Sequence, residues 1–256
     1  VMVKSLRKAL AKYGHGGRDG GGDAGERDPS VDDALLADDE EAIQACVDHL
    51  FECGFDLQQL IEAKGFAKLA LLDKENKDSA VNAVCATDET RAKYEVLSRD
   101  VFKKKKALAG RDDLLEPHRP RFNAIEAVYS QLQDNREAAD VTDIIVELYG
   151  VVADTITVSD SRPPGADTGK RYDISKIDFD RLKREFAKAP NKNTKVQTLK
   201  EAIDRKLKRM VEQNPLRMDF YQRYREIVDD YNRETDRVTI EKTFEELMRL
   251  LGDMDE

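Results

Sequence analysis

Residues 191–232 read NKNTKVQTLKEAIDRKLKRMVEQNPLRMDFYQRYREIVDDYN, a stretch that predicts two helices joined at a proline. Before the proline, apolar residues recur every three or four positions, which places them on one helix face. They are Val196, Leu199, Ile203, Leu207 and Met210. Thr194, with Gln197 three residues later, is typical of a capping box that opens this helix. Asn214-Pro215 predicts its end, because the residue before a proline is pushed out of the α region.

The same periodicity predicts helices along most of the chain. It is carried after Pro215 by Phe220, Tyr221, Tyr224, Ile227, Val228 and Tyr231, and in the last helix by Ile240, Phe244, Leu247, Met248 and Leu251. Nearer the amino end we expect helices over 34–54, 87–109, 121–133 and 141–152, with Gly54 and Gly110 as helix-ending residues. Residues 73–90 have a weaker, polar pattern that predicts partly irregular structure.

The composition agrees with a helical protein of a reducing compartment. The 256 residues include 43 Lys and Arg against 52 Asp and Glu, a formal net charge of −9. Charged residues make up 37% of the chain, well above the usual level of about 25%. No window reaches the roughly 18 apolar residues of a membrane span, which excludes a membrane protein. Three cysteines do not make a disulfide framework, so we expect a cytoplasmic location.

We expect an all-α, irregular multi-helix bundle of two helical subdomains. Residues 1–13 begin within a helical pattern, so we interpret the chain as a piece of a longer protein. A Gly/Asp-rich linker follows over 14–33, and its first 12 residues contain 7 of the chain's 14 glycines, which favours a flexible segment. The subdomains span 34–155 and 175–256, on either side of a Pro-Pro-Gly loop over 156–174.

Charge is uneven within the second subdomain. Residues 181–210 contain 11 Lys and Arg against 3 Asp and Glu, whereas residues 211–256 contain 7 against 13. Two neighbouring helical faces that partly neutralise each other are the simpler interpretation. The alternative is that the basic stretch contacts the phosphates of duplex DNA. The candidate phosphate contacts are Lys183, Arg184, Lys192, Lys195, Arg205 and Lys208.

No motif predicts a catalytic, cofactor or metal site. Gly165–Arg171 (GADTGKR) is similar to a phosphate-binding loop, but Pro164 stands where the first glycine is required, and a basic residue replaces the final hydroxyl residue. Cys46, His49 and Cys53 share a helix face at a spacing that suits zinc. They border an apolar face and have no fourth ligand nearby, so we interpret them as core residues. The chain by itself is therefore not expected to be an enzyme.

Several strings are specific enough to indicate a family. They are YDISKIDFDRLKREFAK (172–188), QNPLRMDFYQRYREIVDDYN (213–232) and TIEKTFEEL (239–247). In this order they resemble the C-terminal region of the R subunit of type I restriction-modification enzymes. SLRKALAKYG (5–14) is similar to the exit from that subunit's second helicase domain, and FECGFD (51–56) stands where its helical domain begins.

The resemblance implies an assembly role. The family's R subunit is an ATP-driven DNA translocase with an endonuclease domain, joined to a methyltransferase core that reads the DNA site. The motifs for ATP binding and cleavage lie upstream, so ATP and Mg²⁺ are expected for the parent protein and not for this chain. The family's helical tail implies docking on the methyltransferase and specificity subunits, with DNA-backbone contact beside the motor as the alternative.

Aromatic and arginine side chains are the candidates for the docking surface, because these residue types dominate interface energies. The candidate interface residues are Arg217, Phe220, Tyr221, Tyr224, Arg225, Tyr231 and Phe244. The aromatic residues of the 218–231 helix have an alternative interpretation, in which they line the core of the bundle.

Overall fold

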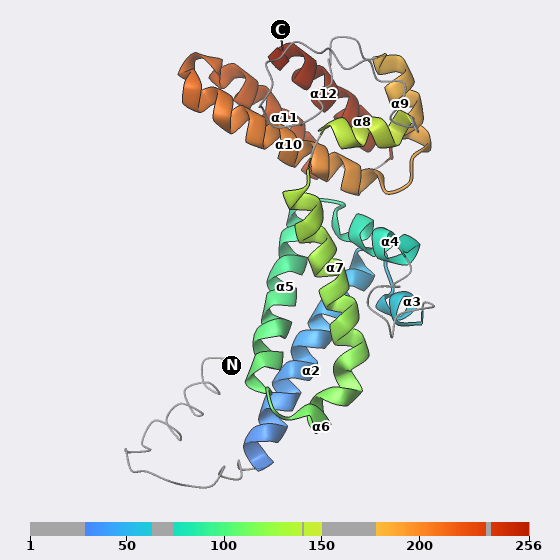
Figure 1. Ribbon diagram of the computed structural model, residues 1–256, viewed down its shortest axis with the longest axis vertical. Helices are drawn as coiled ribbons and strands as arrows, with labels where there is room; N and C mark the ends of the chain where they lie inside the picture. Colours follow the sequence, from blue (N-terminus) through green and yellow to red (C-terminus); the bar gives the residue numbers. More distant parts are fainter. Residues whose placement is uncertain (1–28, 63–73, 140, 150–177, 234–236, 256) are drawn as a thin grey trace, which may run out of the picture.

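The computed structural model describes residues 29–62, 74–139, 141–149, 178–233 and 237–255, and the structural statements below concern these ranges. Their regular structure is helical and includes no strand, which confirms the predicted all-α, multi-helix fold. Two groups of helices, each with its own apolar core, make up this part of the chain (Figure 1). The predicted helix over 1–13, the glycine-rich part of the linker and the loop over 156–174 lie outside the described residues.

The first helix group is a long bundle. Its elements are α2 (Pro29–Glu52), α3 (Leu57–Ile61), α4 (Lys74–Val84), α5 (Asp88–Ala107), α6 (Asp112–Leu115), the 3-10 turn η2 (Glu116–His118) and α7 (Arg119–Glu137). α2, α5 and α7 lie side by side, and α3 and α4 pack against α7 (Figure 1). At the centre the buried Tyr94 hydroxyl donates to the carbonyl oxygen of Ile125 at 3.1 Å, so the polar end of this ring is also satisfied.

Two helices of this group end at glycines, as predicted. Gly54 has φ +90° and Gly110 has φ +88°, a left-handed conformation that strains residues with a Cβ. After α2, the Phe55 amide donates back to the carbonyl oxygen of Leu50 at 3.0 Å. The segment 73–90 is more regular than its sequence indicates. It contains α4, because Ala80, Val81 and Val84 are buried in the first core.

The second helix group surrounds a stacked aromatic pair. Its elements are α8 (Val141–Tyr149), α9 (Phe179–Lys188), α10 (Lys192–Gln213), the 3-10 turn η5 (Pro215–Arg217), α11 (Met218–Arg233) and α12 (Arg237–Asp255). The end of α10 before Pro215 confirms the predicted break. The Phe186 and Phe244 rings stack with centroids 3.9 Å apart and planes 4° apart. Leu182, Val196, Leu199, Ile203, Leu207, Leu247 and Leu251 are buried in the same core.

The two cores divide between α7 and α8. Ile144, Ile145 and Leu148 of α8 are buried in the second core, whereas the sequence predicts this helix within the subdomain 34–155. α8 lies against α9 and α10, because its three buried residues form one apolar face. The division therefore precedes the predicted loop over 156–174.

Replacing Phe244 with Ala should lower the free energy of unfolding by about 3–5 kcal/mol, because the change opens a cavity in a closed core. Urea unfolding followed by circular dichroism measures the loss. Phe51 is 71% exposed on α2, so Phe51→Ala is the matched control, with an expected change within about 0.5 kcal/mol. Equal losses in the two variants would contradict the placement of Phe244 in the core.

Candidate functional site

The two helix groups meet at a polar junction, and one of its contacts sets the start of α10. Asn82 of α4 accepts through Oδ1 from the amides of Asn193 (2.9 Å) and Thr194 (3.3 Å). α10 therefore begins at Lys192, and the capping box predicted at Thr194 is wrong. Its own N-cap residue, Asn191, is left-handed at φ 55° and makes no side-chain cap bond. The first amides of a helix need an acceptor, and here the other helix group supplies it.

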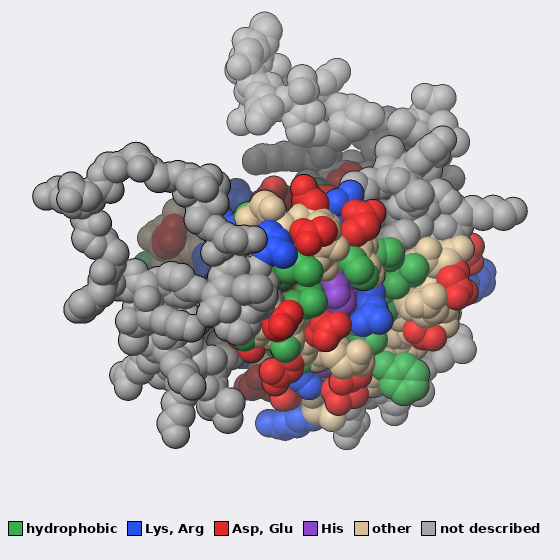
Figure 2. Space-filling model, turned by 90° about the horizontal axis from the view of Figure 1, so that it is seen from below, with side chains coloured by type: hydrophobic (Ala, Val, Ile, Leu, Met, Phe, Trp, Pro, Cys, Tyr) green, Lys and Arg blue, Asp and Glu red, His purple; other side chains and the backbone are tan. Residues whose placement is uncertain are grey.

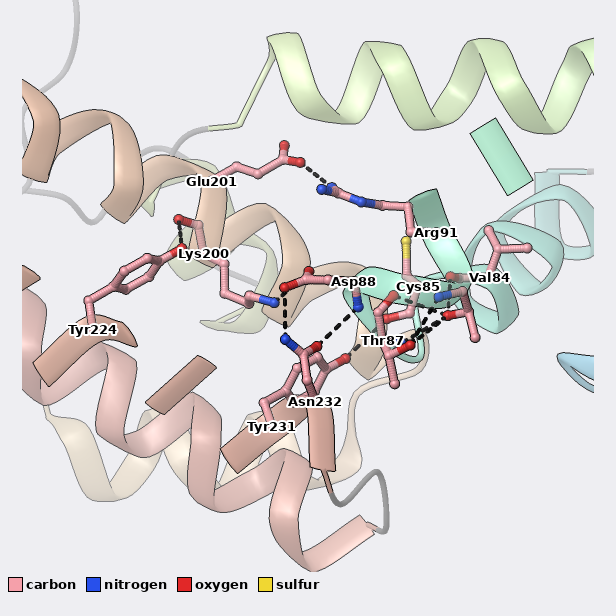
Figure 3. Close-up of polar contacts among 11 residues, drawn as sticks. Val84, Cys85, Thr87, Asp88, Arg91, Lys200, Glu201, Tyr224, Tyr231 and Asn232 are labelled. Carbon is pink, nitrogen blue, oxygen red and sulfur yellow. Dashed lines mark hydrogen bonds and ion pairs between the residues drawn. The ribbon is translucent and has the colours of Figure 1, made fainter. Parts of the chain in front are cut away.

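Asp88, the first residue of α5, is the centre of the junction (Figure 3). Lys200 of α10 donates through Nζ to Asp88 Oδ1 at 2.7 Å. Asn232 of α11 bonds to the same residue twice, donating through Nδ2 to Oδ2 at 3.0 Å and accepting from the Asp88 amide at 3.1 Å. The Lys200 side chain is 4% exposed and the Asp88 side chain 38% exposed. One carboxylate thus holds three helices together.

Two tyrosines of α11 add to the same junction (Figure 3). The Tyr231 hydroxyl donates to the carbonyl oxygen of Cys85 at 3.0 Å, and its ring centroid lies 4.8 Å from Lys200 Nζ. The Tyr224 hydroxyl donates to the carbonyl oxygen of Lys200 at 3.0 Å. A buried tyrosine hydroxyl needs a hydrogen-bond partner. The Tyr231 hydroxyl bonds to a residue of the first helix group, and the Tyr224 hydroxyl joins α11 to α10.

Two arginines complete the contact between the groups. Arg91 of α5 forms an ion pair with Glu201 of α10, with side chains 21% and 17% exposed (Figure 3). Arg205 of α10 donates to the carbonyl oxygen of Ala139, which follows α7. Charged groups in such partly buried positions are stable when they are paired or hydrogen-bonded. The junction therefore consists of hydrogen bonds and ion pairs at several separate points.

Burial and the neighbouring positive charge shift the pKa of Asp88 in opposite directions. Burial alone would raise the pKa of this carboxyl, but the Lys200 ammonium and the hydrogen bonds from Lys200 and Asn232 hold the pKa below its usual value of 3.8. Burial lowers the pKa of Lys200, against the pull of Asp88. Asp88 is therefore ionised at neutral pH and is the counter-ion that the buried ammonium requires.

Three of the predicted interface residues lie in the interior. Tyr231 is fully buried, Phe244 is 1% exposed and Tyr224 is 9% exposed. Phe244 lies in the second core, and Tyr224 and Tyr231 contribute to that core and to the junction, as the core interpretation of the 218–231 helix expects. All three rings are large enough for either role, and the two tyrosine hydroxyls have hydrogen-bond partners in the interior.

The other four predicted interface residues lie at or near the surface around α11. Phe220 and Tyr221 are half-buried and pack against the second core. The Arg217 guanidinium lies 5.9 Å from the centroid of the Phe220 ring, and Arg225 is exposed. All four lie between positions 217 and 225, in η5 and the first half of α11.

The predicted phosphate contacts all have partners within the chain. Lys183 and Lys192 pair with Glu245 and Glu241 of α12, the second pair at 2.7 Å. These pairs join the basic stretch 181–210 to the acidic stretch 211–256, which agrees with partial neutralisation of neighbouring faces. The remaining contacts are Lys195 with Glu147 (2.8 Å), Lys208 with Asp204 (2.6 Å), Arg184 with the Asp180 carbonyl oxygen (3.2 Å) and Arg205 with the Ala139 carbonyl oxygen.

Two of the three residues considered for zinc contact the neighbouring helix α5, and the third, Cys53, lies beside His49. Cys46 is fully buried, with Sγ 3.7 Å from Ser98 Oγ, and His49 Nε2 lies 2.8 Å from the carbonyl oxygen of Thr90. Burial raises the pKa of the Cys46 thiol to about 11 and that of Cys85 to about 12, which leaves both thiols unreactive at neutral pH. Within the described ranges, no three His, Cys, Asp or Glu side chains are placed to hold a metal ion. Gly165–Arg171 lies outside those ranges.

A view from below shows acidic side chains around apolar ones and a histidine (Figure 2). In the first helix group, His118 Nε2 lies 3.6 Å from Glu40 Oε1. Asp39 is fully buried, neither of its carboxylate oxygens has a hydrogen-bond partner, and burial raises its pKa although His118 opposes the shift.

None of the helices in the described ranges has the length and apolar character to cross a membrane.

The sequence matches one family model over most of its length. That model is described as type I restriction enzyme HindI endonuclease subunit-like, C-terminal, and it matches residues 29–256. Searches among curated proteins and among solved structures found no match. The match includes both helix groups and the junction between them.

Removing the charge of Asp88 should lower the free energy of unfolding more than removing that of Lys200. Asp88→Asn should lower the free energy of unfolding by about 3 kcal/mol or more, because it leaves the Lys200 ammonium buried without a counter-ion. Lys200→Met should cost about 1 kcal/mol or less, because Met fills the space of the lysine stem and Asp88 is partly solvated. Urea unfolding measures both changes, with the exposed Asp229→Asn on α11 as control. Equal losses at the two positions would contradict this account of the pair.

The contribution of Asp88 to stability should disappear in acid. Its pKa is lower in the folded than in the unfolded chain, so the folded state binds fewer protons. The stabilisation is therefore complete above the unfolded-state pKa and is lost as the pH falls through the folded-state pKa. Unfolding free energies measured from about pH 6 down to about pH 2 should fall more steeply for the wild type than for Asp88→Asn. Parallel curves would show that Asp88 has no such shift.

Proposed function

The chain belongs to the family of C-terminal domains of type I restriction enzyme endonuclease subunits, and we propose that it attaches the motor subunit to the methyltransferase and specificity subunits. The family match over residues 29–256 is the observation on which this proposal depends. In this proposal, ATP-driven translocation and DNA cleavage belong to other parts of the parent protein. ATP and Mg²⁺ act there, and this chain performs no catalytic step.

The junction supports an assembly role because it makes one body of two helix groups. The ion pair of Asp88 and Lys200, the cap from Asn82 and the hydrogen bond from Tyr231 join residues far apart in the sequence. An attachment module has to hold its binding surface in a fixed position relative to the motor. Hydrogen bonds and ion pairs in such partly buried positions favour one relative arrangement of the groups over others.

Contact with duplex DNA beside the motor is the alternative proposal. The excess of Lys and Arg over residues 181–210 favours it. Against it, the candidate phosphate contacts already have partners, two of them carboxylates of α12. DNA phosphates would have to compete with these carboxylates, so assembly is the better supported function.

Titration calorimetry tests the proposed function. The purified chain, added to the purified complex of methyltransferase and specificity subunits of the same restriction system, should bind with a dissociation constant of about 1 µM or tighter. The same titration into random duplex DNA should give no salt-dependent binding. An absence of binding to the protein complex would overturn the proposal, and salt-dependent binding to DNA instead would favour the alternative.

A further inference from the structure

The α10–α11 hairpin ends in an apolar tip that projects from the second helix group (Figure 1). The tip consists of η5 and the first residue of α11. Leu216 is 90% exposed and Met218 is 44% exposed. Isolated exposed leucines are common on protein surfaces, so exposure alone does not indicate a binding site. This tip differs from an isolated leucine in its fixed conformation, in the packed side chains next to it and in the charge of its neighbours.

Hydrogen bonds fix the conformation of the tip. Asn214 Oδ1 accepts from the Leu216 amide at 3.1 Å, and the Asn214 carbonyl oxygen accepts from the Arg217 amide at 3.1 Å. The Asn214 amide donates to the carbonyl oxygen of Met210 at 2.9 Å, and Pro215 restricts its own φ. An anchor that is already held in one conformation loses little conformational entropy on binding.

The second core supports the tip from behind. Met210, Phe220 and Tyr221 are partly buried and pack against that core. Arg217 lies over the Phe220 ring and donates through Nη1 to Met210 Sδ at 3.4 Å. Partly buried apolar side chains thus lie just before and just after the tip in sequence, and a partner that covers the tip would extend the core across the interface.

Arginines without an ion-pair partner among the described residues lie on α10, η5 and α11 near the tip. Residues 205–225 contain 7 Lys and Arg against 2 Asp and Glu, the exposed Glu212 and Asp219, although the whole chain has a net charge of −9. Arg209 and Arg225 are exposed and Arg217 is half-buried. Among the described residues, none of these three arginines has a carboxylate within ion-pair distance. A complementary partner must therefore present carboxylates around an apolar pocket.

We propose that the hairpin tip inserts Leu216 and Met218 into an apolar pocket bordered by Asp and Glu on the methyltransferase–specificity complex. Arg209, Arg217 and Arg225 pair with the acidic border. This inference rests on the proposed function and deepens it, because it names the surface that docks and the chemistry of the surface that receives it.

A leucine substitution tests the apolar part of the tip. Leu216→Asp should raise the dissociation constant for the purified methyltransferase–specificity complex by about tenfold or more, because it places a charge at the centre of the interface. Val96 is 62% exposed on α5 of the other helix group, so Val96→Asp is the matched control and should bind like the wild type. Thermal unfolding by circular dichroism should be the same for both variants, which confirms that they fold.

Charge reversal at two arginines tests whether the partner's pocket has an acidic border. Arg209→Glu combined with Arg225→Glu should weaken binding by about tenfold and remove most of its salt dependence. Lys103→Glu combined with Arg121→Glu changes the net charge equally at exposed positions of the first helix group, and it should leave binding unchanged. Equal weakening in both double variants would show a general charge effect and overturn the proposed border.

The outcomes separate this inference from the proposed function. If the wild-type chain fails to bind the complex, the proposed function is overturned and the docking tip with it. If the wild type and Leu216→Asp bind equally, the tip is overturned while the assembly role stands. Sedimentation should show a monomer, since self-association that depends on Leu216 would assign the tip to a second copy and overturn the proposal.

Discussion

The buried ammonium group of Lys200 is the main constraint on this structure. Its side chain is 4% exposed on α10, where an unpaired charge would be strongly unfavourable. Its counter-ion, Asp88, lies 112 positions earlier, on α5 of the other helix group. On α11, Asn232 donates a hydrogen bond to Asp88, and the Tyr231 ring lies beside the Lys200 ammonium. Each helix group has its own core, yet Lys200 is stable in its position only when the two groups are together.

The sequence predicted the helices well because helix signals are local. Apolar spacing, Gly54, Gly110 and Pro215 act within a few residues, and the structure has helices and helix ends where these signals lie. The junction could not be predicted in this way. Asn82 caps a helix 111 positions later, and nothing near Asn82 or Thr194 indicates that contact.

The candidate site was predicted only in part, for a related reason. Tyrosines at helical spacing fit a core and an interface equally well, because both roles need a large ring and a bonded hydroxyl. Tyr224 and Tyr231 are interior, whereas Arg217, Phe220, Tyr221 and Arg225 lie at or near the surface around α11. Likewise, the basic stretch 181–210 was visible in the sequence, but its pairing with α12 depends on the tertiary fold. In this C-terminal domain of a restriction endonuclease subunit, the second helix group carries a projecting α10–α11 hairpin (Figure 1).

Hydrogen–deuterium exchange along a urea series tests most directly whether the junction makes the two helix groups one body. Amides in the interior of α5 and in the interior of α11 should become unprotected at the same urea concentration, in one cooperative transition. In Asp88→Asn the two midpoints should separate. Separate midpoints already in the wild type would show that the groups unfold independently and would contradict the account.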